Sequence, residues 1–152
     1  EALQNILNFR KDEGQSLENE FQLRIGNIRQ YMNDALALDP ERVQAIKDRL
    51  QTAISELKVN VDENRFEQEL IYYLEKLDIT EEKVRLTNHL DYFLETIKGT
   101  EANGRKLGFI TQEMGREINT MGSKSNHAQM QKLVVQMKDE LEKIKEQVLN
   151  VL

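Results

Sequence analysis

Two glutamates stand four residues apart in the most unusual stretch of the chain, residues 104–126, which reads GRKLGFITQEMGREINTMGSKSN. If this stretch is helical, Glu113 and Glu117 project from the same edge of the helix. Two carboxylates can hold one Mg²⁺ or Mn²⁺ ion, because these hard cations prefer oxygen ligands, and such an ion can activate water beside a phosphodiester. Pairs of glutamates also occur at this spacing on any acidic helix, so two ordinary surface charges are the simpler interpretation.

Basic and amide side chains accompany this glutamate pair. They lie opposite the apolar stripe of the expected helix or near its ends: Arg105, Lys106, Gln112, Arg116, Asn119 and Lys124. Cations gathered in one place can neutralise phosphates even when the whole chain is acidic. We therefore expect these residues to form an RNA-binding surface, with Arg105, Arg116 and Lys124 at the phosphates.

A phenylalanine, Phe109, stands among these polar residues. An exposed ring at such a position either stacks on a base or packs against another subunit. We favour packing against another subunit.

His89 lies in a helical segment in which Glu82, Arg85 and His89 follow steps of three and four, so that they share a face. A histidine beside carboxylates can act as a general base or as a third metal ligand. A lone helical histidine that only packs is the more frequent case.

Composition excludes several classes of protein. The chain has 152 residues, 39% of them hydrophobic, which is enough for the core of one domain. It contains no cysteine, which excludes a disulfide framework, a thiolate zinc site and a cysteine nucleophile. Phosphate-cradling GxxxxGK[ST], GxGxxG, GxSxG and HExxH motifs do not occur. No apolar run approaches the length of a membrane span, so we expect a cytoplasmic protein with no membrane contact.

The elements that must position these residues are helices. Apolar residues recur at steps of three and four almost throughout, and one proline and seven glycines leave little room for turn-rich β structure. This pattern predicts an all-α bundle of about six helices, whose apolar stripes fall within residues 3–35, 43–57, 66–77, 84–97, 107–121 and 130–151.

Several residues mark where these helices should begin and end. Asp39 and Pro40 would open the second helix, Gly122 would close the fifth, and Ser125 or Asn126 would cap the last. The last helix carries a strict heptad of apolar residues from Met130 to Val151. A stripe this narrow predicts packing against one or two other long helices.

Charge is unevenly divided along the chain. Residues 1–103 carry 13 basic and 21 acidic side chains, a net of −8, whereas residues 104–152 carry 8 basic and 6 acidic ones, a net of +2. Any contact with nucleic acid is therefore expected at the fifth helix and its flanking turns.

The chain begins at Glu1, without methionine, and is already helical in pattern by Leu3. We interpret residues 1–152 as one helical domain from the C-terminal part of a longer protein.

Five segments of the chain match the pattern of one known family: RKDEGQ with Leu17 (residues 10–17), RFEQEL (65–70), residues 78–89 with His89, the 104–126 stretch, and EKIKEQVLN (142–150). Together they resemble the C-terminal half of the YicC-like proteins. The similarity covers essentially the whole chain in one order, and the 104–126 motif is long and specific. The motif positions that carry over are Arg65, Glu67, Glu69, Glu81, Glu82, Arg85, His89, Arg105, Gln112, Glu113, Arg116, Glu117, Asn119, Ser123 and Lys124.

This resemblance implies a function. The family comprises bacterial cytoplasmic proteins, long described as stress-induced, that are regarded as metal-dependent endoribonucleases. They act on RNA as ring-like homo-oligomers, with a hexamer as one expected size, and an N-terminal domain precedes the helical part. In that frame Glu113, Glu117 and His89 are our candidate catalytic residues, and Glu113 and Glu117 would bind Mn²⁺ or Mg²⁺. The alternative is a non-catalytic oligomerisation domain that presents RNA.

This sequence departs from the family at two positions. Gly108 and Gly115 stand where the family commonly has Asp and Asn, so that a polar stripe running through Gln112 and Asn119 is interrupted. Each glycine also costs about 1 kcal/mol of helix propensity against alanine.

Overall fold

The computed structural model describes residues 2–56, 62–99 and 104–151. The described residues form six helices: α1 Ala2–Ala37, α2 Asp39–Glu56, α3 Glu63–Lys76, α4 Thr80–Lys98, α5 Gly104–Lys124 and α6 Ala128–Val148. None of these residues lies in a β-strand, and the predicted all-α fold is confirmed. Between the predicted apolar stripes we expect breaks near residues 59–62 and at 103–104, and these fall partly outside the described ranges. In those ranges no helix has the length and hydrophobicity needed to cross a lipid bilayer.

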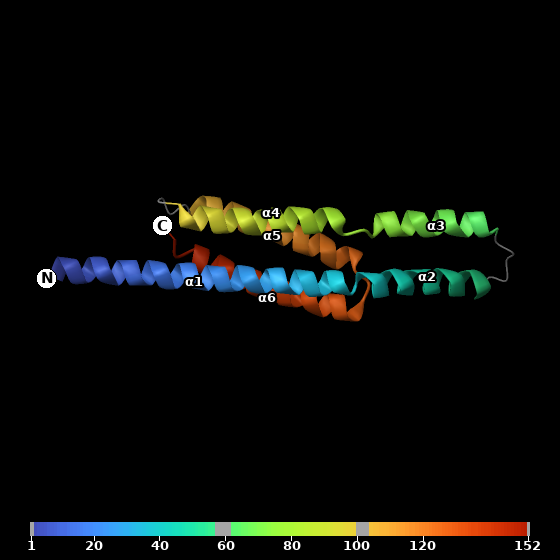
Figure 1. Cartoon of the computed structure of the whole chain (residues 1–152), viewed down its shortest axis with the longest axis horizontal. Helices are drawn as coiled ribbons and strands as arrows, with labels where there is room; N and C mark the ends of the chain where they lie inside the picture. The colour runs from blue at the N-terminus through green and yellow to red at the C-terminus, as the bar shows by residue number, and fades with distance from the viewer. Residues whose placement is uncertain (1, 57–61, 100–103, 152) are drawn as a thin grey trace.

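Four of the helices form a bundle. Helix α1 packs against α4 and α6, and α5 packs against the same two helices from the other side. Neighbours in the bundle run in opposite directions, which gives an up-and-down arrangement (Figure 1). Helices α2 and α3 continue α1 and α4 beyond one end of the bundle and pair with each other as a projecting hairpin.

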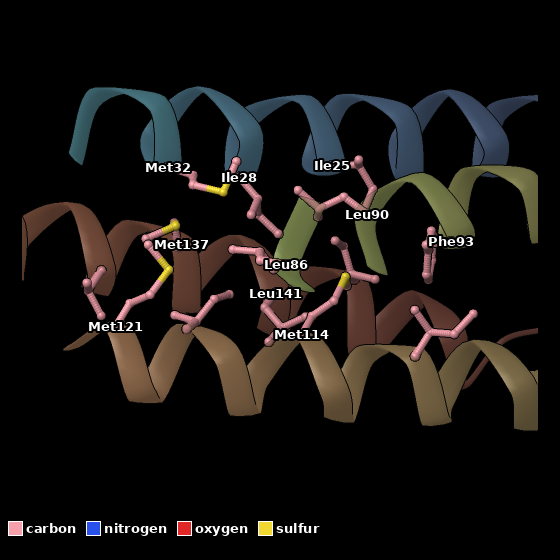
Figure 2. Close-up of a cluster of buried hydrophobic side chains, with 14 of the residues drawn as sticks. Ile25, Ile28, Met32, Leu86, Leu90, Phe93, Met114, Met121, Met137 and Leu141 are labelled. Carbon is pink, nitrogen blue, oxygen red and sulfur yellow. The ribbon is translucent and has the colours of Figure 1, made fainter. Parts of the chain in front are cut away.

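The core lies between α1, α4, α5 and α6. Figure 2 shows side chains from all four helices meeting there, including Ile28, Leu90, Met114 and Met137. The predicted apolar stripe of the last helix is buried from Met130 through Val148. By contrast, every described side chain from residue 2 to residue 16 is exposed, so the first part of α1 extends past the core.

Some predicted helix ends are shifted. Helix α5 runs through Gly122 to Lys124. The residue that caps α6 is His127, not Ser125 or Asn126, because the His127 Nδ1 accepts a hydrogen bond from the Met130 amide at 3.3 Å. The buried Ser125 hydroxyl instead donates to the Met121 carbonyl, at 2.6 Å. A histidine ring can cap a helix, but sequence preferences for capping favour the shorter side chains.

A buried arginine joins the hairpin to the bundle. Arg42, near the start of α2, is 3% exposed. Its Nη1 donates to the Leu77 carbonyl at the end of α3, at 2.6 Å, and to the Lys124 carbonyl at the end of α5, at 3.1 Å. Its Nη2 lies 2.7 Å from Oδ1 of Asp39. The Arg42 guanidinium thus supplies hydrogen-bond donors to carbonyls at the ends of α3 and α5, and its ion pair with Asp39 stabilises the start of α2.

Two glycines of α5 differ in their surroundings, and this gives a testable prediction. A Cβ at Gly108 would meet no heavy atom within 4 Å, whereas one at Gly122 would lie 3.1 Å from Cγ1 of the stiff Val134 side chain. Gly108→Ala should therefore raise the free energy of unfolding by about 1 kcal/mol through helix propensity. Gly122→Ala should gain less or destabilise the protein. Urea denaturation of both variants checks this, and an equal gain would contradict the packing at Gly122.

A second prediction concerns Glu140, which links α6 to α1. Its Oε2 accepts hydrogen bonds from Nη1 of Arg24 and Nδ2 of Asn27, each at 3.2 Å. Burial alone would raise the pKa of Glu140, but the hydrogen bonds from Asn27 and Arg24 outweigh it, and the pKa is lowered below its ordinary value of 4.5. The carboxylate therefore stabilises the native state above pH 4.5, and this contribution is lost as the pH falls through the lowered pKa.

Glu140→Gln should accordingly destabilise the protein at neutral pH, and the difference from the wild type should shrink as the pH falls below 4.5. Thermal unfolding of both proteins across this range measures the difference directly. A difference that stays constant with pH would show that the carboxylate charge does not contribute.

Candidate functional site

Four of the six predicted RNA-binding residues lie along one exposed face of α5, together with Phe109. We call these five residues the outer row: Arg105, Phe109, Gln112, Arg116 and Asn119, all exposed. Their steps of four, three, four and three keep them on one side of the helix. The row contains no acidic residue, in a chain with a net charge of −6.

The two candidate catalytic glutamates have different environments although they lie one turn apart. The Glu113 side chain is 24% exposed and its Oε1 lies 3.7 Å from Nη2 of Arg116. Glu117 is 4% exposed and faces α4, where its Oε1 accepts a hydrogen bond from Nε of Arg85 at 2.9 Å. The helix edge that the two carboxylates share therefore lies where α5 passes from solvent to its contact with α4. Glu113 is near solvent, and Glu117 is buried between the helices.

Arg85 gathers three carboxylates at this boundary. Besides Glu117, it contacts Oε2 of Glu81 through Nη1 at 3.1 Å and Oε1 of Glu82 through Nη2 at 3.6 Å. The pKa of Arg85 is raised above its ordinary value, first by the hydrogen bond to Glu117 and then by that to Glu81. Its side chain is nevertheless 46% exposed, so the same guanidinium also faces solvent.

Glu82 is the most buried carboxylate of the site, at 2% exposure. Its Oε1 accepts a hydrogen bond from Nζ of Lys124 at 2.7 Å, and its Oε2 has no partner within the described part of the chain. Burying a carboxylate is costly unless it is paired, so Lys124 and Arg85 must neutralise this charge. We call Glu82, Arg85, Glu117 and Lys124 the α4–α5 seam.

Both lysines predicted to bind RNA have partners inside the protein. Lys124 Nζ is held by Glu82 and also donates to the Asp78 carbonyl at 3.0 Å. Lys106 Nζ lies 4.9 Å from the ring centroid of Tyr92 on α4. Both remain beside the outer row, but the arginines of the row are more accessible to a phosphate.

His89 lies half-buried on α4, one turn beyond Arg85. Helices α4 and α5 are antiparallel, and Arg85 contacts Glu117. One turn towards the C-terminus of α4 leads from Arg85 to His89, and one turn towards the N-terminus of α5 leads from Glu117 to Glu113, so His89 and Glu113 lie at the same level of the two helices. In the described ranges, no three acidic or histidine side chains come close enough together to hold one metal ion. A metal site on Glu113 and Glu117 would therefore need water or a ligand to complete it.

Three carried-over positions lie away from the seam. Arg65, Glu67 and Glu69 are exposed on α3, in the projecting hairpin (Figure 1). For Glu82 and Arg85, by contrast, the sequence offered two signals: the helix face that they share and their place in the family motif. Their contacts with α5 depend on which helices pack together, and the spacing within one helix does not show that.

The fold and this site define a class: an up-and-down helical bundle with a charged seam between two of its antiparallel helices. A sequence model described as "Endoribonuclease YicC-like, C-terminal" matches residues 35–152. The chain belongs to this YicC-like family.

Two curated relatives support this assignment. The chain is 37% identical over 154 residues to a "Probable endoribonuclease YicC" of Clostridioides difficile (strain 630). It is 32% identical over 151 residues to a protein of the same name from Haemophilus influenzae (strain ATCC 51907 / DSM 11121 / KW20 / Rd). Each alignment covers 99% of this chain and 53% of the relative, so the chain spans about half the length of the relatives it matches.

Proposed function

We propose that this chain is the C-terminal helical domain of a divalent-metal-dependent endoribonuclease, and that RNA binds along α5 beside the α4–α5 seam. The relatives' names support RNA cleavage as the activity. The location rests on the Glu117–Arg85 pair. The buried carboxylate of Glu117 lies 2.9 Å from Nε of Arg85, whose side chain is 46% exposed, and the pair lies next to the outer row, which contains no acidic residue.

The residues around the pair can perform distinct tasks. Arg105 and Arg116 present guanidinium groups, which bind phosphate oxygens in a bidentate manner. Arg85 is accessible from the same edge and can contact a phosphate while it holds Glu117 in place. His89, half-buried beside this edge, has an imidazole that can act as a general base or as a further ligand.

Glu113 and Glu117 suit a divalent cation by donor type. Mg²⁺ is commonly bound through one or two carboxylates together with waters and substrate phosphates, and a two-carboxylate site fits that pattern. When bound, Mg²⁺ or Mn²⁺ would polarise the phosphodiester and activate water. Glu113, which is 24% exposed, would be the carboxylate open to an arriving ion, and Glu117 would be fixed from behind by Arg85.

RNA cleavage by full-length protein tests this proposal. The wild type, Glu113→Gln and Glu117→Gln are incubated with structured RNA and Mn²⁺, and Glu142→Gln serves as a control because its carboxylate is exposed on α6. We expect the control to cleave like the wild type and the two variants to lose most activity. The amide keeps the shape of the side chain but removes its charge.

Each outcome has a distinct meaning. Equal cleavage by all four proteins would overturn the assignment of the two carboxylates. Cleavage by none of them would favour the alternative, a non-catalytic domain that presents RNA. The ring-like homo-oligomer, the preceding N-terminal domain and the bacterial cytoplasmic location stay predictions from the family resemblance.

A further inference from the structure

Phe109 is the large hydrophobic side chain of α5 that the bundle leaves exposed, at 62% of its surface. Its neighbours in the outer row, Arg105 and Gln112, are polar and exposed. The centre of a surface that buries against another protein subunit is usually a contiguous apolar patch. Within the outer row Phe109 is flanked by a guanidinium and an amide, so the row does not form such a patch.

A second aromatic ring lies across from this end of α5. Tyr92 of α4 is 43% exposed, and the Lys106 ammonium lies 4.9 Å from its ring centroid. The space beside Phe109 is also open on one flank, since a Cβ at Gly108 would meet no heavy atom within 4 Å. Two exposed rings, Phe109 and Tyr92, and the Lys106 ammonium therefore lie near the N-terminal end of α5.

The charges of the outer row favour a polyanion. Arg105 and Arg116 are separated by eleven residues, which is about 16 Å along a helix. Phe109 and Gln112 lie between them on the same face. Among the described residues no carboxylate pairs with Arg105, whereas Nη2 of Arg116 lies 3.7 Å from Oε1 of Glu113 and its side chain is still 73% exposed. Nucleic-acid-binding proteins that recognise single strands combine these two elements, a positive track for the backbone and an aromatic ring for a base.

We propose that the outer row binds single-stranded RNA, with an unpaired base stacked on Phe109 and flanking phosphates at Arg105 and Arg116. Bases in a duplex are already stacked on each other and cannot offer a face to the ring. The site therefore selects unpaired segments such as loops and ends. This inference rests on the proposed function, because it names the form of RNA that reaches the same site.

Binding measured without cleavage tests the inference. Full-length protein is titrated in EDTA with a fluorescein-labelled single-stranded RNA of twelve nucleotides and with the matching duplex, and anisotropy is recorded. Phe109→Leu should weaken binding of the single strand about tenfold. Phe109→Tyr should bind like the wild type, and binding of the duplex should not change. Val135→Ala serves as a control, because Val135 is 52% exposed on a different helix, α6.

Two results would overturn the inference. One is unchanged single-strand affinity in Phe109→Leu. The other combines two findings: sedimentation shows that Phe109→Leu dissociates a multimer formed by the wild type, and the substitution weakens binding of single-stranded and duplex RNA equally. These findings would place the ring in a contact between copies.

The inference and the proposed enzymatic activity can fail separately. A protein that binds RNA through Phe109 but cleaves none contradicts only the enzymatic activity. A protein that cleaves RNA but binds it independently of Phe109 contradicts only the stacking site.

Discussion

Lys124→Met should lower the free energy of unfolding by about 3 kcal/mol. The reason is Glu82, which is 2% exposed and whose Oε1 lies 2.7 Å from the lysine Nζ. Its Oε2 already lacks a partner within the described ranges, and the nearest remaining cation, Arg85, is 3.6 Å from Oε1. Removing Lys124 leaves a buried carboxylate with little compensation, and chemical denaturation measures the loss.

The double variant Glu82→Gln/Lys124→Met should recover more than half of this loss, because an amide is far cheaper to bury than a carboxylate. Lys132→Met, at an exposed position of α6, is the matched control and should change stability little. If the effects of the two substitutions in the double variant simply add, the ion pair does not hold the seam together.

Arg42→Met should be similarly destabilising, by about 3 kcal/mol, because it removes charge-assisted hydrogen bonds at a position that is 3% exposed. The carbonyls of Leu77 and Lys124 would lose their donor. Since these carbonyls end α3 and α5, the projecting hairpin should also separate from the bundle more easily. Hydrogen exchange should therefore accelerate in α2 and α3 more than in the core of α6.

Arg49→Met is the control for this experiment, because Arg49 is exposed on the same helix. It should leave both stability and hydrogen exchange close to those of the wild type. Exchange that accelerates evenly over all six helices in Arg42→Met would contradict a local joint at Arg42.

The helices could be predicted because each depends on a periodic pattern within its own segment. The apolar residues of α5 and α6 are buried where their spacing places them, from Leu107 to Met121 and from Met130 to Val148. The first turns of α1 also form a helix as predicted, but Leu3 is 72% exposed, because periodicity predicts an amphipathic helix without showing what covers its face.

The seam could be predicted only in part. Spacing identified Glu117 as a candidate, but it placed Glu117 beside Glu113 as an equal partner. The structure buries Glu117 against Arg85 and leaves Glu113 near solvent. This difference depends on the register between α4 and α5, which are paired through contacts distant in sequence. Arg42 was not identified because its partners, two helix ends, are close to it only in the folded chain.

Gly108 and Gly115, the two positions where the chain departs from the family pattern, have different surroundings in the fold. Sequence alone placed Gly108 and Gly115 in one interrupted polar stripe. In the fold, a Cβ at Gly115 would lie 3.3 Å from Cδ2 of Leu141, so this position lies against α6, while Gly108 borders open space beside Phe109. Of the stripe, Gln112 and Asn119 remain exposed in the outer row.

A structure of the full-length protein with Mn²⁺, in which the ion is located by its anomalous scattering, tests the central claim most directly. The account predicts an ion at the edge between α4 and α5, with carboxylate oxygens of Glu113 and Glu117 within about 2.0–2.3 Å and Arg85 still in contact with Glu117. An ion bound elsewhere, with neither glutamate among its ligands, would contradict it.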